Sequence, residues 1–214
     1  MQNFKYIFFD LDGTLVDSSI GIKNAFHYAF TSLHIKTPES KKLDTFIGPP
    51  LEVSFASTVP ETDLNQAISY FREYYKDKGV FEAQLYYGIK ELLIELEKSD
   101  YHIYITTSKN ESMANKMAQY LKIDKYFNGI FGSLPNSYYK ADVLARALNH
   151  SHATLEQSVI VGDTKFDMIG GKSVGINTLG VLWGFGKQDE LTINGADFIS
   201  DSPQNLLTTL INKA

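Results

Sequence analysis

The sequence contains no cysteine, which excludes disulfide bridges, thiolate metal sites and thiol nucleophiles. It has no excess of basic residues either, because 20 Lys and Arg stand against 25 Asp and Glu, a formal net charge of −5. A chain with this charge lacks the broad positive field that non-specific nucleic-acid binding requires. No stretch approaches the roughly 18 consecutive apolar residues of a membrane span. We therefore expect neither a nucleic-acid partner nor a membrane association.

The amino terminus does not resemble a secretion signal. Its apolar run extends only from Tyr6 to Phe9 and ends at Asp10, so we expect a cytoplasmic protein. The chain has 214 residues, of which 43% are apolar and 21% charged. This length and composition suit a globular core with a smaller insert.

Four apolar runs without polar alternation predict strands that are buried on both faces, as in a parallel sheet. From about residue 86 onward these runs alternate with helical patterns, such as the apolar residues of the segment 89–96. This order predicts an α/β fold with a doubly wound, mainly parallel, Rossmann-like sheet. The runs are Tyr6–Phe9, Tyr101–Ile105, Ser158–Val161 and Ile176–Val181, with weaker candidates at Gly129–Phe131 and Phe198–Ile199.

The segment from residue 17 to residue 84 interrupts this alternation. It contains no convincing strand, whereas apolar stripes at helical spacing begin at Ala25 and Ile68, and prolines separate them. We therefore predict an all-helical insert over residues 17–84 and an α/β core formed by residues 1–16 and 85–214.

Polar residues follow the first three strong strands directly. Asp10 and Asp12 follow the first, Thr107 and Ser108 the second, and Asp163 the third. Open α/β sheets bind ligands at the carboxyl ends of their strands, so we expect these side chains to converge on one pocket.

The acidic residues in these positions suit a hard, oxygen-ligated cation such as Mg²⁺. Asp10 and Asp12 raise each other's pKa in a half-buried pocket unless a cation lies between them, and Gly13 permits a sharp turn there. Asp163 and Asp167 would share one face of a helix that begins at Asp163. The alternative interpretations are an ordinary Asp-x-Asp-Gly turn and a solvated, helix-capping acidic turn.

The hydroxyls of Thr107 and Ser108 lie where we expect a helix to begin after a strand. Hydroxyls and unpaired backbone N–H groups in such a position suit a phosphate oxygen, although helix capping is the more common use of these residues. Lys140 precedes another predicted helix and gains interest from the other three motifs, since a lone lysine is usually at the surface.

In this order and spacing, the four motifs resemble those of the haloacid dehalogenase (HAD) superfamily, specifically its phosphoglycolate-phosphatase-like branch with a helical cap of the C1 type. The resemblance covers essentially the whole chain. For the phosphate-binding hydroxyl of the second motif, Thr106 is an adjacent alternative to Thr107. The matching residues are, in motif order, Phe8–Leu15, Thr107–Lys109, Lys140, and Gly162–Asp163 with Asp167.

The resemblance implies phosphoryl transfer through a covalent aspartyl-phosphate, with Mg²⁺ as cofactor. Asp10 would be the nucleophile and a metal ligand. Asp12 would be the general acid and base, and would bind the metal through its backbone carbonyl. Asp163 would complete the metal site, with Asp167 as an auxiliary carboxylate. The implied catalytic residues are Asp10, Asp12, Thr107 and Lys140, and the implied phosphate-binding residues are Asp10, Leu11, Asp12, Gly13, Thr107, Ser108 and Lys140.

The implied substrate is a small phosphorylated metabolite, phosphoglycolate- or nucleotide-like. A sugar phosphomutase and a phosphonatase of the same fold are alternatives. The mutases hold a second phosphate with a cap arginine, which is absent from the stretch Gly48–Glu52. A non-enzymatic phospho-acceptor module is a further alternative, because receiver domains also place acids, a hydroxyl and a lysine at strand ends. The sequence leaves the substrate and the oligomeric state open.

Overall fold

The computed structural model describes residues 4–49, 51–99, 101–135 and 137–211. Pro50, in the stretch that lacks an arginine, lies outside the described residues. The chain divides into two compact units, one formed by Met1–Asp17 with Leu85–Ala214 and the other by Ser18–Gln84. In the part of the chain that the structure describes, no helix is long and apolar enough to cross a membrane.

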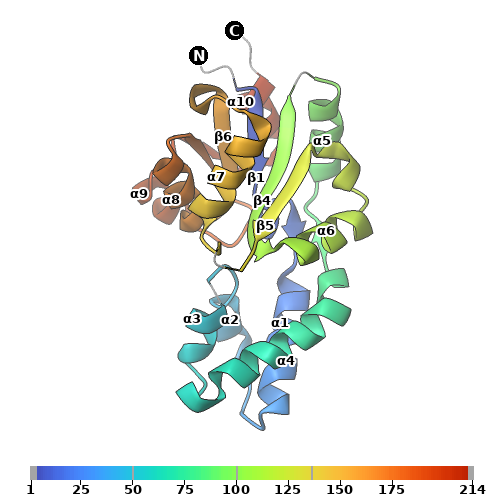
Figure 1. Cartoon of the computed structure of the whole chain (residues 1–214), viewed down its shortest axis with the longest axis vertical. Coiled ribbons are helices and arrows are strands. Elements are labelled where there is room, and N and C mark those ends of the chain that lie inside the picture. The colour runs from blue at the N-terminus through green and yellow to red at the C-terminus, as the bar shows by residue number, and fades with distance from the viewer. Residues whose placement is uncertain (1–3, 50, 100, 136, 212–214) are drawn as a thin grey trace. The chain divides into compact units, whose positions relative to one another are not determined.

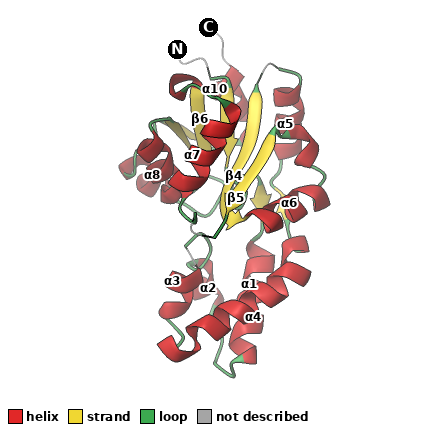
Figure 2. Cartoon of the chain, viewed as in Figure 1, coloured by secondary structure: helices red, strands yellow, loops and turns green. Residues whose placement is uncertain are grey.

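The larger unit is built on six parallel strands: β1 (Tyr6–Phe9), β4 (His102–Asn110), β5 (Gly129–Ser133), β6 (Ser158–Gly162), β7 (Asn177–Val181) and β8 (Phe198–Ser200). Their order in the sheet is β5-β4-β1-β6-β7-β8, which confirms the predicted Rossmann-like α/β class. Figure 2 shows β4 and β5 of this sheet side by side. Because β1 pairs with both β4 and β6, the order of the strands reverses beside it. The carboxyl end of β1 is therefore the switch point, where folds of this class bind their ligands.

Helices cover both faces of this sheet: α5 (Ile89–Glu97), α6 (Glu111–Tyr120), α7 (Lys140–Ser151), α8 (Lys165–Val174), α9 (Gln188–Ile193) and α10 (Pro203–Ile211). Figure 1 shows α7 and α8 on one side of the sheet and α5 and α6 on the other. On the first side, Phe8, Tyr104 and Ile160 from three neighbouring strands form a buried cluster with Leu144 and Leu148 of α7. Each large apolar side chain buried in this way contributes about 1.5–3 kcal/mol, so this packing fixes α7 against the strands that end at the switch point.

Residues 18–83, described except for Pro50, contain helices and no strand, as the predicted fold class requires, whereas Asp17 and Gln84, the two ends of the predicted all-helical insert, lie in short strands. The α-helices of the smaller unit are α1 (Ser19–Ser32), α2 (Ser40–Asp44), α3 (Leu51–Ala56) and α4 (Leu64–Asp77). Two short strands at the ends of the insert, β2 (Val16–Asp17) and β3 (Gln84–Leu85), pair with each other. The centre of the helical unit is aromatic, because the ring of Phe26 lies 5.1, 4.9 and 4.8 Å from the rings of Phe46, Phe55 and Phe71.

Phe26 should therefore dominate the stability of the helical unit. We expect Phe26→Ala to lower its free energy of unfolding by about 3–5 kcal/mol, because the cavity loses contacts with three rings. The matched control Phe26→Leu should cost less. Native-state hydrogen exchange should show faster exchange in α1 and α4, with the amides of β1 and β6 still protected. Unchanged exchange in α1 and α4 would contradict this account of the unit's core.

Candidate active site

Asp10 is placed by the register of the sheet. It is the first residue after β1, and its backbone N–H donates to the carbonyl of Val161 in β6 at 2.8 Å. The side chain is buried, so its carboxylate lies at the switch point and away from bulk water. The turn that follows is closed by the N–H of Gly13, which donates to the carbonyl of Val16 at 2.8 Å, and Leu11 beside it is fully buried.

Lys140, the first residue of α7, connects three oxygen atoms in this buried region. Its Nζ lies 2.7 Å from Asp10 Oδ1, 2.8 Å from Asp167 Oδ1 and 2.9 Å from the backbone carbonyl oxygen of Thr106. The contacts with Asp10 and Thr106 are hydrogen bonds, and the contact with Asp167 is an ion pair. Burial lowers the pKa of Lys140, but the carboxylates of Asp10 and Asp167 more than offset this, and the net shift is upward. Lys140 is therefore positively charged at neutral pH.

Asp163 follows β6 and is fully buried. The hydroxyl of Thr14 donates to its Oδ1 at 3.0 Å, and the backbone N–H of Phe185 donates to its Oδ2 at 2.8 Å. Gly13 makes this arrangement possible, since it has a φ of +85° and a Cβ at that position would overlap the Asp163 carboxylate. The sequence did not identify Thr14 or Phe185 as partners of Asp163, because a backbone donor has no side-chain signal and Phe185 is 22 residues away.

The carboxylate of Asp167 lies in the same region, but the interaction that orients it differs from the predicted one. The expectation that Asp163 and Asp167 share a helical face is wrong, because α8 begins only at Lys165 and Thr164 is its N-cap. The N–H and the hydroxyl of Thr164 both donate to Asp167 Oδ2, at 3.0 and 2.8 Å. This capping box turns the carboxylate back toward the end of β6. Because Asp163 and Asp167 are both fully buried, a solvated acidic turn is excluded.

Asp10, Asp163 and Asp167 form one cluster, in which a carboxylate oxygen of each lies within 4.8 Å of the others. Three carboxylates against the single ammonium of Lys140 leave two negative charges in a buried volume. Burial raises the pKa of Asp10 to about 6, with Lys140 opposing the rise and Asp167 adding to it. Burial and the same neighbouring carboxylates raise the pKa of Asp163 well above its ordinary value. A divalent cation with oxygen ligands would supply the missing charge, so the donor set fits Mg²⁺.

The carboxyl-terminal half of β4 contacts this cluster, since the carbonyl of Thr106 accepts from Lys140. Thr107 is buried, and its Oγ1 accepts from the backbone N–H of Lys109 at 3.2 Å. The hydroxyl of Thr106 is buried without a hydrogen-bond partner among the described residues, while Ser108 is exposed. The expectation that a helix begins at Thr107 is wrong: β4 continues to Asn110, whose side-chain oxygen accepts from an N–H in the first turn of α6.

The carboxylate of Asp12 stands apart from the three clustered acids. Its Oδ2 lies 3.0 Å from Nζ of Lys109, which the sequence identified as part of a motif without assigning a role to its side chain. The two acids of the first motif therefore have different lysine partners, Lys140 for Asp10 and Lys109 for Asp12.

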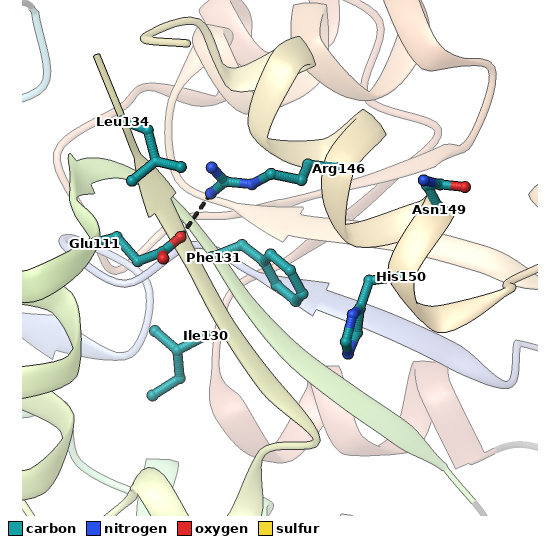
Figure 3. Close-up of a pocket in the computed structure, with 7 residues that line it drawn as sticks. All are labelled: Glu111, Ile130, Phe131, Leu134, Arg146, Asn149 and His150. Carbon is teal, nitrogen blue, oxygen red and sulfur yellow. Dashed lines mark hydrogen bonds and ion pairs between the residues drawn. The ribbon is translucent and has the colours of Figure 1, made fainter.

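A separate cavity of about 390 Å³ lies at the edge strand β5 and shares no residue with the acidic cluster (Figure 3). Its charged residues, Glu111 and Arg146, form an ion pair at 2.6 Å. Arg146 also donates to the carbonyl of Gly132, and Glu111 accepts from the N–H of the same residue. The pair thus occupies backbone groups of an edge strand that would otherwise favour the addition of another strand. We interpret this cavity as structural.

A parallel α/β sheet whose central strand ends in a buried carboxylate, beside a lysine and two further carboxylates, suits phosphoryl chemistry around a divalent cation. The comparisons with known proteins agree. The chain belongs to the haloacid dehalogenase-like hydrolases, because the sequence model of that family matches residues 7–181. The predicted class of enzyme, a HAD-type phosphatase, is thereby confirmed, and the phospho-acceptor alternative is set aside.

Three relatives illustrate the range of this similarity. A 5'-nucleotidase of Pseudomonas aeruginosa is 33% identical over 189 residues, which cover 86% of this chain and 86% of the relative. The tyrosine-protein kinase PtkA of Mycobacterium tuberculosis is 31% identical over 204 residues, covering 94% of this chain and 67% of the relative. Among solved structures, the haloacid dehalogenase-like hydrolase SP0104 from Streptococcus pneumoniae is 47% identical, with a TM-score of 0.93 and coverage of 96% and 98%.

The charge imbalance predicts that removing one acid stabilises the protein when no metal is present. In Asp163→Asn, the amide oxygen can still accept from Phe185 and the amide nitrogen can donate to Thr14, while the repulsion is lost. We expect the free energy of unfolding in EDTA at about pH 7 to rise by about 1–3 kcal/mol, and Mg²⁺ to stabilise the variant less than the wild type. Urea denaturation with and without Mg²⁺ measures both effects. The exposed Asp124→Asn is the control, and a less stable Asp163→Asn in EDTA would contradict the prediction.

The raised pKa of Asp10 predicts a dependence of stability on pH. Since its pKa rises from 3.8 to about 6 on folding, the folded state holds the proton more tightly than the unfolded state. The associated stability is present below about pH 4 and is lost as the pH rises through about 6. In EDTA, the wild type should lose about 3 kcal/mol relative to Asp10→Asn over this range. Urea denaturation at a series of pH values measures this difference. If the free energies of unfolding of the two proteins changed in parallel with pH, the prediction would be contradicted.

Proposed function

We propose that this chain is a Mg²⁺-dependent phosphatase that hydrolyses a small organic phosphate monoester through an aspartyl-phosphate on Asp10. The observation that carries the proposal is the cluster at the switch point, where Asp10 shares Lys140 with Asp167 and lies beside Asp163. A phosphate dianion approaches a carboxylate only when its charge is neutralised, and the lysine together with a divalent cation supplies this neutralisation.

The nucleophile is Asp10, whose Oδ1 is held by Lys140 so that the carboxylate has a fixed orientation. In the first step, a carboxylate oxygen of Asp10 forms a bond to phosphorus and the bond from phosphorus to the ester oxygen breaks. Asp12 donates a proton to that departing oxygen. In the second step, Asp12 takes a proton from a water molecule, which attacks phosphorus and releases inorganic phosphate and the free Asp10 carboxylate.

The remaining residues bind rather than react. Asp163 and the backbone carbonyl of Asp12 would hold Mg²⁺ together with the nucleophile Asp10, with Asp167 as an auxiliary carboxylate, and the ion would offset the charge of the phosphoryl oxygens. Lys140 and the hydroxyl of Thr107 would contact those oxygens, with Thr106 as the alternative hydroxyl. The backbone around Leu11 and Gly13 and the residue Ser108 would complete the phosphate site.

We propose that the substrate is phosphoglycolate- or nucleotide-like, and that the helical unit selects it as a cap. The similarity to a 5'-nucleotidase supports a nucleoside monophosphate. A sugar phosphomutase or a phosphonatase would differ in its products. Release of inorganic phosphate from a nucleoside monophosphate, compared with phosphoglycolate and glucose 6-phosphate, separates the hydrolase from a mutase, which would isomerise the sugar phosphate instead.

Loss of the proposed nucleophile should abolish the activity. We expect Asp10→Asn to lower kcat for p-nitrophenyl phosphate by about 10³-fold or more, because an amide does not form the acyl phosphate. EDTA should abolish the wild-type activity and Mg²⁺ should restore it. The exposed Asp124→Asn should retain full activity, whereas an Asp10→Asn variant as active as the wild type would refute the assignment.

A further inference from the structure

The side chain of Lys109 is buried to an unusual extent for a lysine, since only 9% of it is exposed. A buried ammonium is costly unless it is paired with an opposite charge. It forms an ion pair with Asp12, whose Oδ2 lies 3.0 Å from Lys109 Nζ and whose own side chain is 18% exposed. The pair is therefore largely buried but still reaches the solvent.

The backbone directs Lys109 toward this position. β4 pairs with β5 in regular register up to Thr106 and pairs again at Asn110, with a shift of register between them. Such bulges redirect side chains and are frequent beside active sites. On one side, the Lys109 N–H donates to the hydroxyl of Thr107, and on the other, Asn110 caps α6 through the N–H of Ser112 at 3.1 Å. The chain is thus fixed on both sides of Lys109.

We infer that Lys109 is a positioning residue, which orients the carboxylate of Asp12 for both of its proton transfers. This inference rests on the proposed function. The ammonium holds the carboxylate of Asp12 in one orientation, in which this acid can give its proton to the departing oxygen and later take one from water. Lys109 itself stays protonated throughout and exchanges no proton with the substrate. It thus serves Asp12 as Lys140 serves Asp10, with one lysine fixing the orientation of each acid of the motif.

The choice of leaving group tests this role. p-Nitrophenolate departs without being protonated, whereas the alkoxide of glycerol 2-phosphate requires a proton from Asp12. We expect Lys109→Met to lower kcat for glycerol 2-phosphate by about 10²-fold while KM changes by less than about threefold. With p-nitrophenyl phosphate, the variant should release one equivalent of nitrophenolate rapidly and then turn over slowly, because only the second step still requires Asp12.

The controls separate positioning from other roles. Lys109→Arg keeps a charged donor and should recover part of kcat, and the exposed Lys90→Met should match the wild type. If Lys109→Met does not fold, Lys109→Gln serves in its place, with a thermal melt to establish folding. A raised KM with normal kcat would assign Lys109 to substrate binding instead, and normal kcat without a burst would show that Asp12 is oriented without it. A wild type inactive on both substrates would refute the proposed function itself.

Discussion

The site depends on one buried ammonium. Lys140 lies within 2.9 Å of oxygen atoms from the turn after β1, from β4 and from the first turn of α8, so a single charge connects three segments that are distant in sequence. The close packing around it requires small residues, because a Cβ at Gly170 would lie 2.6 Å from Lys140 Cγ. The sheet places these segments next to one another, and the charge of Lys140 keeps the carboxylates of Asp10 and Asp167 together.

The same arrangement contains more negative than positive charge. Lys140 balances one of three buried carboxylates, and the raised pKa values of Asp10 and Asp163 reflect their burial first and the remaining repulsion second. Proteins commonly retain such unfavourable groups where function needs them, at a cost in stability. Here the unmet negative charge is what would attract a divalent cation, and through it a phosphate. Stability and activity therefore oppose each other at this site.

Much of this could be predicted from the sequence, because local signals specify it. Unalternated apolar runs predicted the strands, and the polar residues that follow them pointed to Asp10 and Asp163, whereas Lys140 was singled out only by its place among the other motifs. Contacts set by tertiary geometry could not be predicted. The route by which Asp167 reaches the cluster depends on the cap at Thr164, and the pairing of Lys109 with Asp12 depends on a register shift against β5. The substrate is not specified by these motifs, because in the proposed function they would contact only its phosphate.

The central claim is that Asp10 and Asp163 hold one divalent ion in common. Anomalous diffraction from crystals grown with Mn²⁺ in place of Mg²⁺ tests it most directly. The account predicts a single strong peak within ligand distance of a carboxylate oxygen of Asp10 and of Asp163. Mn²⁺ bound elsewhere, with these two carboxylates ligating no ion, would contradict it.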